Sequence, residues 1–92
     1  MIQSFRDGWA EHLMAGRRVP ELVNIEEQAR TRLIRLDSAT SLEDLRALRG
    51  NRLEALIGDR KGQFSIRIND QYRICFKWGE KGPTDVEITD YH

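Results

Sequence analysis

Cysteine, proline and histidine are scarce in this chain of 92 residues, and its charges cancel. It has one cysteine, two prolines and two histidines, and its formal net charge is zero. Cys75 alone can form no internal disulfide and cannot by itself build a zinc site. No apolar run approaches the roughly 20 residues that span a bilayer. Residues 1–12 contain no apolar signal core, so we expect a cytoplasmic protein.

What remains is the composition of a single folded domain. Hydrophobic residues make up 39% and charged residues 33% of the chain, a balance typical of globular rather than disordered proteins. At this length we expect one domain over residues 1–92, near the lower end of what folds alone around one core.

The charges are unevenly distributed although their sum is zero. Residues 46–77 hold eight basic and three acidic side chains, a local charge of +5. Residues 1–45 carry a charge of −2 and residues 78–92 a charge of −3. A local positive region can attract phosphate even when the total cancels. Scattered arginines on a solvated surface explain the pattern equally well.

The N-terminal half predicts helices. Asp7 is a good N-cap for a helix that begins near Gly8, and Pro20 suits the first position of a second helix. His12 lies on the first helix, and we assign it no chemistry. An apolar stripe at helical spacing follows Pro20 and predicts a helix face packed on a sheet: Leu22, Ile25, Ala29, Leu33 and Leu36.

Three shorter segments complete this half. Met1–Phe5 is a candidate first strand. Ser41–Leu45 is a candidate short helix with Ser41 as its cap. Arg52–Ile57 alternates in polarity and predicts a strand, with Leu53, Ala55 and Ile57 on its apolar side, although its alanine and glutamate also suit a helix.

The C-terminal third predicts an antiparallel hairpin. Gln63–Ile68 and Tyr72–Trp78 both alternate apolar and polar residues. Both apolar sets reach one core only if Ile68 lies opposite Tyr72, which leaves residues 69–71 as a three-residue loop. We therefore expect an α+β fold, with two N-terminal helices packed on one face of a small, mainly antiparallel sheet.

This register places Arg67 opposite Arg73 and Ser65 opposite Cys75 on the polar side. Like charges directly opposite each other destabilise a strand pair by roughly 0.2–1 kcal/mol. We favour an anion lying between the two arginines as the reason for the pair. The alternative is that both guanidinium groups point apart into solvent.

A last strand over Asp85–Tyr91 is predicted with Val86 and Ile88 facing the core. Strict alternation then places Asp90 and His92 on the core side as well. Either the strand bends or ends before Asp90, or the active face continues around the sheet edge, and the pattern alone does not decide.

The polar residues of this third suit metal-independent RNA cleavage, which needs a base, an acid and cations for the phosphorane charge. His92 can act as base or acid near neutral pH, and Tyr91 can supply a proton or stack on a base. Arg73 and Arg67 suit the phosphate, because a guanidinium binds two oxygens at once. The pattern contains no metal or cofactor motif.

Three segments together resemble a known family. Residues 51–56 read NRLEAL, residues 58–78 read GDRKGQFSIRINDQYRICFKW, and residues 85–92 read DVEITDYH. This combination resembles the HigB-type toxins of the RelE/ParE toxin superfamily, which belong to type II toxin–antitoxin systems. The likeness extends along the whole chain and implies a RelE-like microbial RNase fold.

The resemblance implies a ribosome-dependent endoribonuclease that cuts mRNA in the ribosomal A site without a metal or other cofactor, and so halts translation and growth. Arg73, Asp90, Tyr91 and His92 match the family's catalytic positions, with His92 the expected general base. Arg67 lies close to a family arginine.

The resemblance also implies partners. These are a HigA-type helix-turn-helix antitoxin, the ribosome and mRNA, and operator DNA bound through the antitoxin complex, with no membrane. Arg60, Lys61, Gln71 and Lys77 are our candidates for RNA contacts. Some relatives have a lysine where this chain has Ile57, and some have asparagine at the position of Gln71.

Two other functions stay open from the sequence. One is a non-catalytic nucleic-acid or partner-binding module that acts with a DNA-binding antitoxin as a repressor complex. The other is an enzyme that cuts free RNA without ribosomes.

Overall fold

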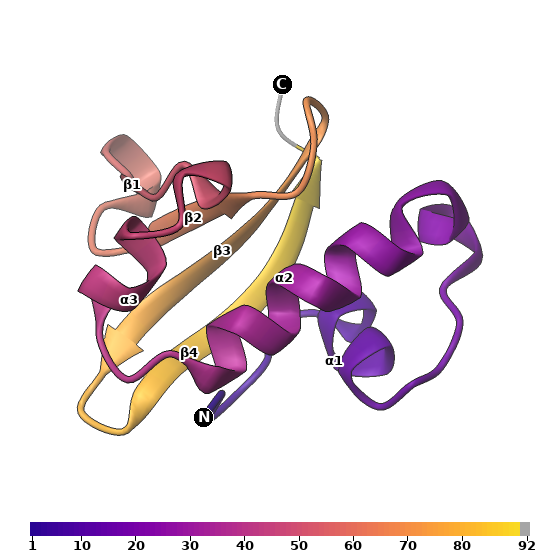
Figure 1. Ribbon diagram of the computed structural model, residues 1–92, viewed down its shortest axis with the longest axis horizontal. Coiled ribbons are helices and arrows are strands. Elements are labelled where there is room, and N and C mark those ends of the chain that lie inside the picture. Colours follow the sequence, from indigo (N-terminus) through magenta and orange to yellow (C-terminus); the bar gives the residue numbers. More distant parts are fainter. Residues whose placement is uncertain (91–92) are drawn as a thin grey trace.

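A four-stranded antiparallel sheet with helices packed against it forms the protein (Figure 1). The computed structural model describes residues 1–90. The strands lie in the order β1-β2-β3-β4, which makes the sheet a meander. They are β1 (Glu54–Ala55), β2 (Phe64–Arg67), β3 (Tyr72–Gly79) and β4 (Gly82–Asp90). The predicted α+β class is confirmed.

The helices come before the sheet in the chain. They are α1 (Gly8–Met14), the 3₁₀ helix η1 (Pro20–Ile25), α2 (Glu26–Ser38) and α3 (Leu42–Arg46). Figure 1 shows α2 running across the sheet, with α1 beside it near the N-terminus. Two further 3₁₀ turns, η2 (Arg49–Asn51) and η3 (Gly58–Arg60), flank β1. In residues 1–90, no helix is both long and apolar enough to cross a membrane.

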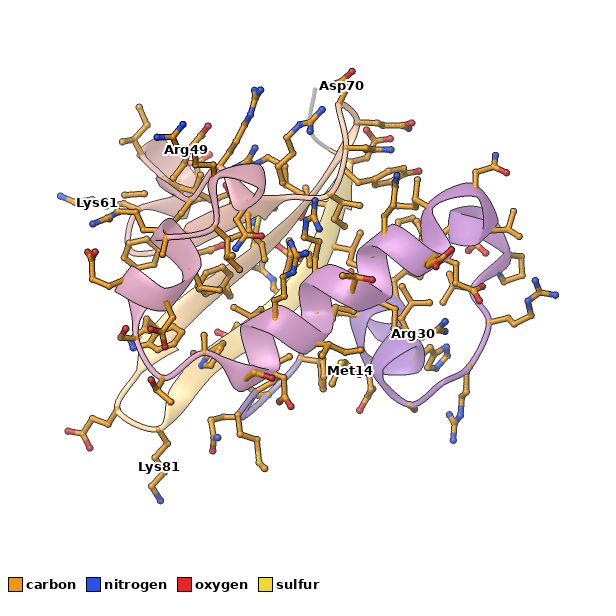
Figure 2. All side chains as sticks on the ribbon, viewed as in Figure 1. Met14, Arg30, Arg49, Lys61, Asp70 and Lys81 are labelled. Atoms are coloured by element: carbon orange, nitrogen blue, oxygen red, sulfur yellow. The ribbon has the colours of Figure 1, made fainter. Side chains whose placement is uncertain are left out.

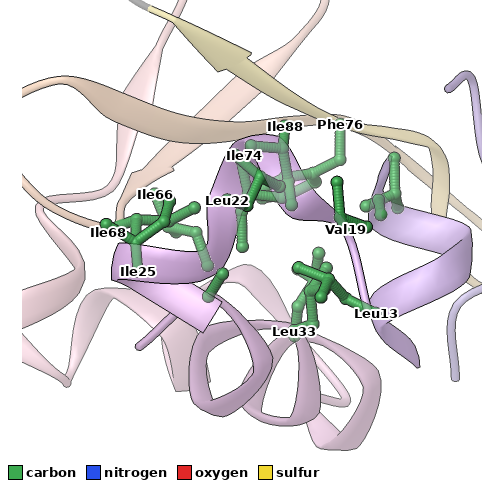
Figure 3. Close-up of a cluster of buried hydrophobic side chains, with 14 of the residues drawn as sticks. Leu13, Val19, Leu22, Ile25, Leu33, Ile66, Ile68, Ile74, Phe76 and Ile88 are labelled. Atoms are coloured by element: carbon green, nitrogen blue, oxygen red, sulfur yellow. The ribbon is translucent and has the colours of Figure 1, made fainter. Parts of the chain in front are cut away.

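One hydrophobic core joins the helices to the sheet. The apolar stripe predicted for the second helix is buried at every position. It meets the inward side chains of the strands, as Figure 3 shows for Leu22, Leu33, Ile66, Ile74 and Phe76. Each large apolar side chain that leaves water contributes about 1.5–3 kcal/mol to folding. The core is therefore the main source of stability.

The β2–β3 register agrees with the prediction. Ile66 pairs with Ile74, and Arg67 pairs with Arg73. The amide of Ile68 donates to the carbonyl of Tyr72 at 3.0 Å. Residues 69–71 therefore form the connecting loop, as the alternation of the two strands requires.

Asp7 connects α1 to the sheet. It is the N-cap of α1, as predicted, and its Oδ1 accepts from the amide of Ala10 at 3.1 Å. Its Oδ2 accepts from the amide of Ile88 in β4 at 3.2 Å. Burial raises the pKa of Asp7, an effect that these two hydrogen bonds oppose and the nearby charge of Glu87 reinforces.

The second helix is less regular than predicted. Pro20 does begin a helix, but residues 20–25 wind as η1, and the α-helix begins only at Glu26. Leu22 has non-helical dihedral angles (φ −114°, ψ 15°). A 3₁₀ turn has three residues, so it brings Leu22 and Ile25 onto the same side, where both are buried.

The strand predicted over Arg52–Ile57 is wrong in length and in orientation. Only Glu54 and Ala55 form β1, and both are exposed. Leu56 is buried, whereas Ile57 is exposed. The cause is backbone geometry at both ends, because Arg52 (φ 45°) and Gly58 (φ 66°) are left-handed and interrupt extended pairing.

The β3–β4 connection is shorter than the interval between the two predicted strands, Tyr72–Trp78 and Asp85–Tyr91. Gly79 pairs directly with Gly82, and β4 begins there rather than at Asp85. The register then shifts between Cys75 and Lys77, and Asp85 opposite this irregularity has a φ of 51°. This bulge sets which residues of β4 face the core.

Met1–Phe5, expected as a strand, forms only one parallel bridge, between Phe5 and Val86. Backbone hydrogen bonds join Gln3 to Pro83 and Arg6 to Val86. The N-terminal segment therefore lies along the outer edge of β4 without becoming a full strand.

Two neighbouring positions of α2 test where stability comes from. Leu33 is 0% exposed and Ile34 is 52% exposed. We expect Leu33→Ala to lower the free energy of unfolding by about 2–5 kcal/mol. Ile34→Ala should change it by less than about 0.5 kcal/mol. Urea denaturation of both variants measures the difference, and equal losses would contradict the assigned core.

Asp7 gives a prediction about pH. Its raised pKa means that the folded protein keeps the proton to higher pH than the unfolded chain does. The resulting contribution to stability is present at low pH and is lost as the pH rises from about 4 through the folded-state pKa.

Asp7→Asn keeps one side-chain oxygen that can cap α1, but the side chain can no longer ionise. Its NH₂ group replaces the oxygen that accepts from the amide of Ile88. We expect it to be destabilising, by an amount that shrinks as the pH rises. Denaturation of both proteins across acid and neutral pH measures this difference. A destabilisation that grows with pH would mean that the two hydrogen bonds lower the pKa of Asp7 by more than burial raises it.

Candidate active site

A pocket of about 290 Å³ lies where β1, β2 and β3 meet the hairpin loop of residues 69–71. Figure 2 shows Asp70 at this end of the hairpin, with Lys81 at the opposite end of the sheet. Charged and amide side chains dominate the lining of the pocket, which consists of Arg52, Glu54, Arg67, Asn69, Asp70 and Arg73. Two of the five predicted catalytic residues, Arg67 and Arg73, thus share one pocket.

Arg73 is buried and held by neutral acceptors. Its Nε donates to Ser65 Oγ at 2.7 Å, and its Nη2 donates to the backbone carbonyls of Arg52 at 2.7 Å and Ser65 at 3.4 Å. The carboxylate of Glu54 lies 3.9 Å from the same nitrogen. Because these acceptors come from two separate segments, they fix both the position and the plane of the guanidinium group.

Arg52 supplies one acceptor through an unusual backbone conformation. Its dihedral angles (φ 45°, ψ 57°) are left-handed, a region that few non-glycine residues adopt. The preceding residue, Asn51, is fully buried and donates from Nδ2 to the carbonyl of Leu45 at 3.1 Å. This bond anchors the end of α3 beside the pocket and holds Arg52 where its carbonyl reaches Arg73.

Arg67 is more accessible than Arg73. Its Nη2 donates to Asp70 Oδ1, three residues further along the hairpin. Its backbone carbonyl accepts from Nε of Arg32 in α2 at 3.1 Å. Burial, followed by the charges of Arg35 and Arg67, lowers the pKa of Arg32. Several arginines therefore lie near one another at this end of the molecule.

The predicted Arg67–Arg73 pair is present, but its surroundings differ from both interpretations of the sequence. Arg73 turns inward onto Ser65, and Arg67 is paired with Asp70. Each guanidinium group thus has a carboxylate nearby, which reduces their mutual repulsion. That an anion binds between them stays a prediction.

Asp90 lies at the same end of the sheet. It pairs with Tyr72 across β3 and β4, and its Oδ2 accepts from Nε2 of Gln71 at 3.1 Å. The strand thus continues through Asp90, so of the two alternatives that the pattern left open, the structure excludes a strand that ends before this residue. By strand alternation Asp90 shares the face of Tyr72 and Ile88, which is opposite that of Arg73. Tyr91 and His92 lie outside the described residues.

Three of the four RNA-contact candidates lie away from the pocket. Arg60 donates from Nη1 to Glu87 Oε1 at 2.6 Å. Lys61 is exposed beyond η3, to one side of the sheet in Figure 2. Lys77 is four residues beyond Arg73 along β3, which separates the two backbone positions by roughly 13 Å. Its Nζ lies 3.4 Å from Oδ2 of Asp85. Gln71 alone is at the hairpin loop.

The polar side of β3 is not open along its length. Cys75, which follows Arg73 on this side, is fully buried. Burial raises the pKa of the Cys75 thiol, so it carries little thiolate at neutral pH. Among residues 1–90, no three His, Cys, Asp or Glu side chains gather as a metal site requires. The chemistry of the pocket is therefore that of guanidinium, carboxylate and amide groups.

Glu54, Asn69 and Asp70 were not predicted as site residues, and neither was the backbone role of Arg52. One signal was present, since Asp70 follows Arg67 at a spacing that a three-residue hairpin loop brings together. Glu54 enters the pocket because it pairs with Ser65 across β1 and β2. A strand of two residues carries no alternation from which that register could be predicted.

Comparison with known proteins agrees with the resemblance seen in the sequence. Residues 3–92 match the model of a family described as "RelE-like toxin of type II toxin-antitoxin system HigB". The chain is also similar to "Toxin HigB-1" of Vibrio cholerae, at 40% identity over 80 residues, or 85% of this chain and 84% of that protein. The family match spans the helices, the meander and the arginine pocket. The chain therefore belongs to the HigB-like family of RelE-like toxins of type II toxin–antitoxin systems.

Proposed function

We propose that this toxin is a ribosome-dependent mRNA endoribonuclease that cleaves by metal-independent acid–base chemistry through the 2′-hydroxyl. The observation that carries the proposal is the fixed guanidinium group of Arg73 in a pocket that it shares with Arg67. A rigid cation beside the scissile phosphate can stabilise the phosphorane without reorganising as the charge develops. Arg67 supplies a second, more accessible cation to the same phosphate.

The remaining catalytic groups follow β4. Its last described residue, Asp90, lies beside the hairpin loop, and Tyr91 and His92 come next in the sequence. We assign His92 as the general base that takes the proton of the 2′-hydroxyl. Because Asp90 faces away from Arg73, this assignment takes the other alternative left open by the sequence, an active face that continues around the sheet edge. Tyr91 donates a proton or stacks on a base, and Asp90 orients His92. Gln71, which donates to Asp90, contacts RNA at the edge of the site.

Contacts with the ribosome belong to the residues outside the pocket. Lys61 and Lys77 are exposed, and Arg60 is half-buried. We assign them to phosphates of ribosomal RNA or of mRNA flanking the cut. Such contacts raise affinity without selecting a sequence. On this assignment the mRNA is held by two sets of cations, one inside the pocket and one away from it.

The antitoxin that this toxin family implies is, on our proposal, a HigA-type helix-turn-helix protein. Its complex with the toxin would bind operator DNA through the antitoxin and repress their shared operon. The exposed apolar side chains of the helical layer, Val23 and Ile34, offer a surface for it outside the arginine pocket.

Catalysis is tested by induced expression of the wild type, His92→Ala and Arg73→Ala. Loss of a general base should reduce cleavage about 10²–10⁴-fold. Loss of the fixed cation should reduce it about 10²–10³-fold. Growth curves and mapped mRNA ends provide the readout. Glu80→Gln in the exposed β3–β4 turn is the control and should arrest growth like the wild type.

Arg73 is buried, so its variant also requires a folding control. Arg73→Lys keeps the charge but cannot satisfy Ser65 and the Arg52 carbonyl together, and should cleave slowly while remaining folded by circular dichroism. Growth arrest by the His92 and Arg73 variants equal to that of the wild type would refute the catalytic assignment. If the protein cleaves naked transcript as fast as it cleaves mRNA on ribosomes, it is a nuclease of free RNA and not a ribosome-dependent enzyme.

The partner is tested separately from the chemistry. Co-expression of a helix-turn-helix protein encoded beside the toxin should restore growth, and the two proteins should co-purify. Val23→Glu together with Ile34→Glu should weaken this complex without reducing mRNA cleavage. A complex unaffected by both changes would place the antitoxin elsewhere on the toxin.

A further inference from the structure

Two carboxylates lie inside the pocket that is proposed to bind phosphate. Asp70 Oδ1 accepts from Nη2 of Arg67, and Glu54 Oε1 lies 3.9 Å from Nη2 of Arg73. In a site that only attracts RNA, a carboxylate beside each arginine would be unfavourable, because it weakens the attraction of phosphate. The charged groups that line the pocket are three arginines and two carboxylates, so their net charge is +1 rather than +3.

These carboxylates are far more exposed than the arginines they face. The side chain of Asp70 is 98% exposed and that of Glu54 is 57% exposed, against 29% for Arg67 and 11% for Arg73. Ion pairs with an exposed partner are weak, because water and salt screen them. A phosphate that binds both arginines can therefore displace Asp70 and Glu54 into solvent.

Hydrogen bonds from other residues shape the hairpin loop and hold Arg73. Asn69 shapes the hairpin loop, since its Oδ1 accepts from the amides of Gln71 at 2.9 Å and Tyr72 at 2.7 Å. Arg73 is held by the hydroxyl of Ser65 and the carbonyl of Arg52. Removing the negative charge of Glu54 or Asp70 leaves these hydrogen bonds in place.

We propose that Glu54 and Asp70 are specificity-determining residues that compete with RNA phosphate for Arg73 and Arg67, and so keep the pocket weak for RNA that the ribosome does not hold in place. This inference rests on the proposed function and deepens it. It assigns ribosome dependence in part to the toxin's own side chains.

The size of the effect follows from Coulomb's law. A carboxylate a few ångströms from a bound phosphate, in a solvated pocket, weakens binding about three- to fivefold. Two such groups together weaken it about ten- to twentyfold. A ribosome that tethers the mRNA at the pocket offsets this loss, because effective concentrations of tethered groups reach about the millimolar range. Free RNA has no such compensation.

The test measures RNA binding separately from cleavage. The probe is a short single-stranded RNA with 2′-O-methyl groups throughout, which the proposed chemistry cannot cut. Fluorescence anisotropy with full-length Glu54→Gln, Asp70→Asn and the double variant should show about three- to fivefold tighter binding for each single change. The salt dependence of the double variant should steepen, by about 0.7 in log–log slope for each additional phosphate that the protein neutralises.

Glu80→Gln is the matched control. It makes the same change in net charge at the β3–β4 turn, away from the pocket. Its affinity should equal that of the wild type, and an increase as large as those of the pocket variants would overturn the inference. Wild-type affinity in all three pocket variants would overturn it as well. Thermal unfolding of the two single variants confirms that each is folded before binding is compared.

A second readout links the carboxylates to ribosome dependence. The double variant should cut unmodified RNA in the absence of ribosomes at least about tenfold more than the wild type does, in line with its tighter binding. If the wild type does not cut mRNA on ribosomes, the proposed function fails, but the binding data still decide whether the carboxylates oppose RNA. If the double variant binds more tightly without increased cleavage of free RNA, the specificity role is refuted while the proposed function stands.

Discussion

The pairing of β2 with β3 is the constraint on which both the core and the pocket depend. Ile66 opposite Ile74 turns one set of side chains toward α2, and the same register turns Arg67 and Arg73 to the other face. A slip of one residue would exchange the two faces. It would put guanidinium groups into an apolar core, where an unpaired charge costs several kcal/mol. The hydrophobic effect therefore also positions the cations of the site.

The helical half of the chain supports the site through a second route. Asn51, buried at the end of η2, is anchored to α3 by the carbonyl of Leu45. The next residue, Arg52, then presents its own carbonyl to Arg73. A buried guanidinium group is stable only when its donors are satisfied. The left-handed conformation of Arg52 thus costs some local free energy, which its hydrogen bond with Arg73 offsets.

The structure can be predicted from the sequence where the alternation of apolar and polar residues sets it, but not where tertiary contacts do. Two alternating strands and one core were sufficient to predict that Arg67 faces Arg73, and helical spacing predicted the stripe from Leu22 to Leu36. No local preference predicts a left-handed arginine, because Arg52 adopts that conformation in a tertiary hydrogen-bond network. Glu54 was missed for the same reason, since its position follows from a two-residue strand.

Zero net charge is compatible with a toxin proposed to act on RNA. A strongly basic protein binds any RNA through its phosphates, and much of it would be held away from the ribosome. Here three arginines gather in the pocket beside the hairpin loop, while Asp70 and Glu54 reduce their field at the pocket itself. On the proposed function, such a pocket would bind free RNA weakly and favour mRNA delivered in a fixed position. The carboxylates beside Arg67 and Arg73 are then part of how the proposed enzyme selects its target.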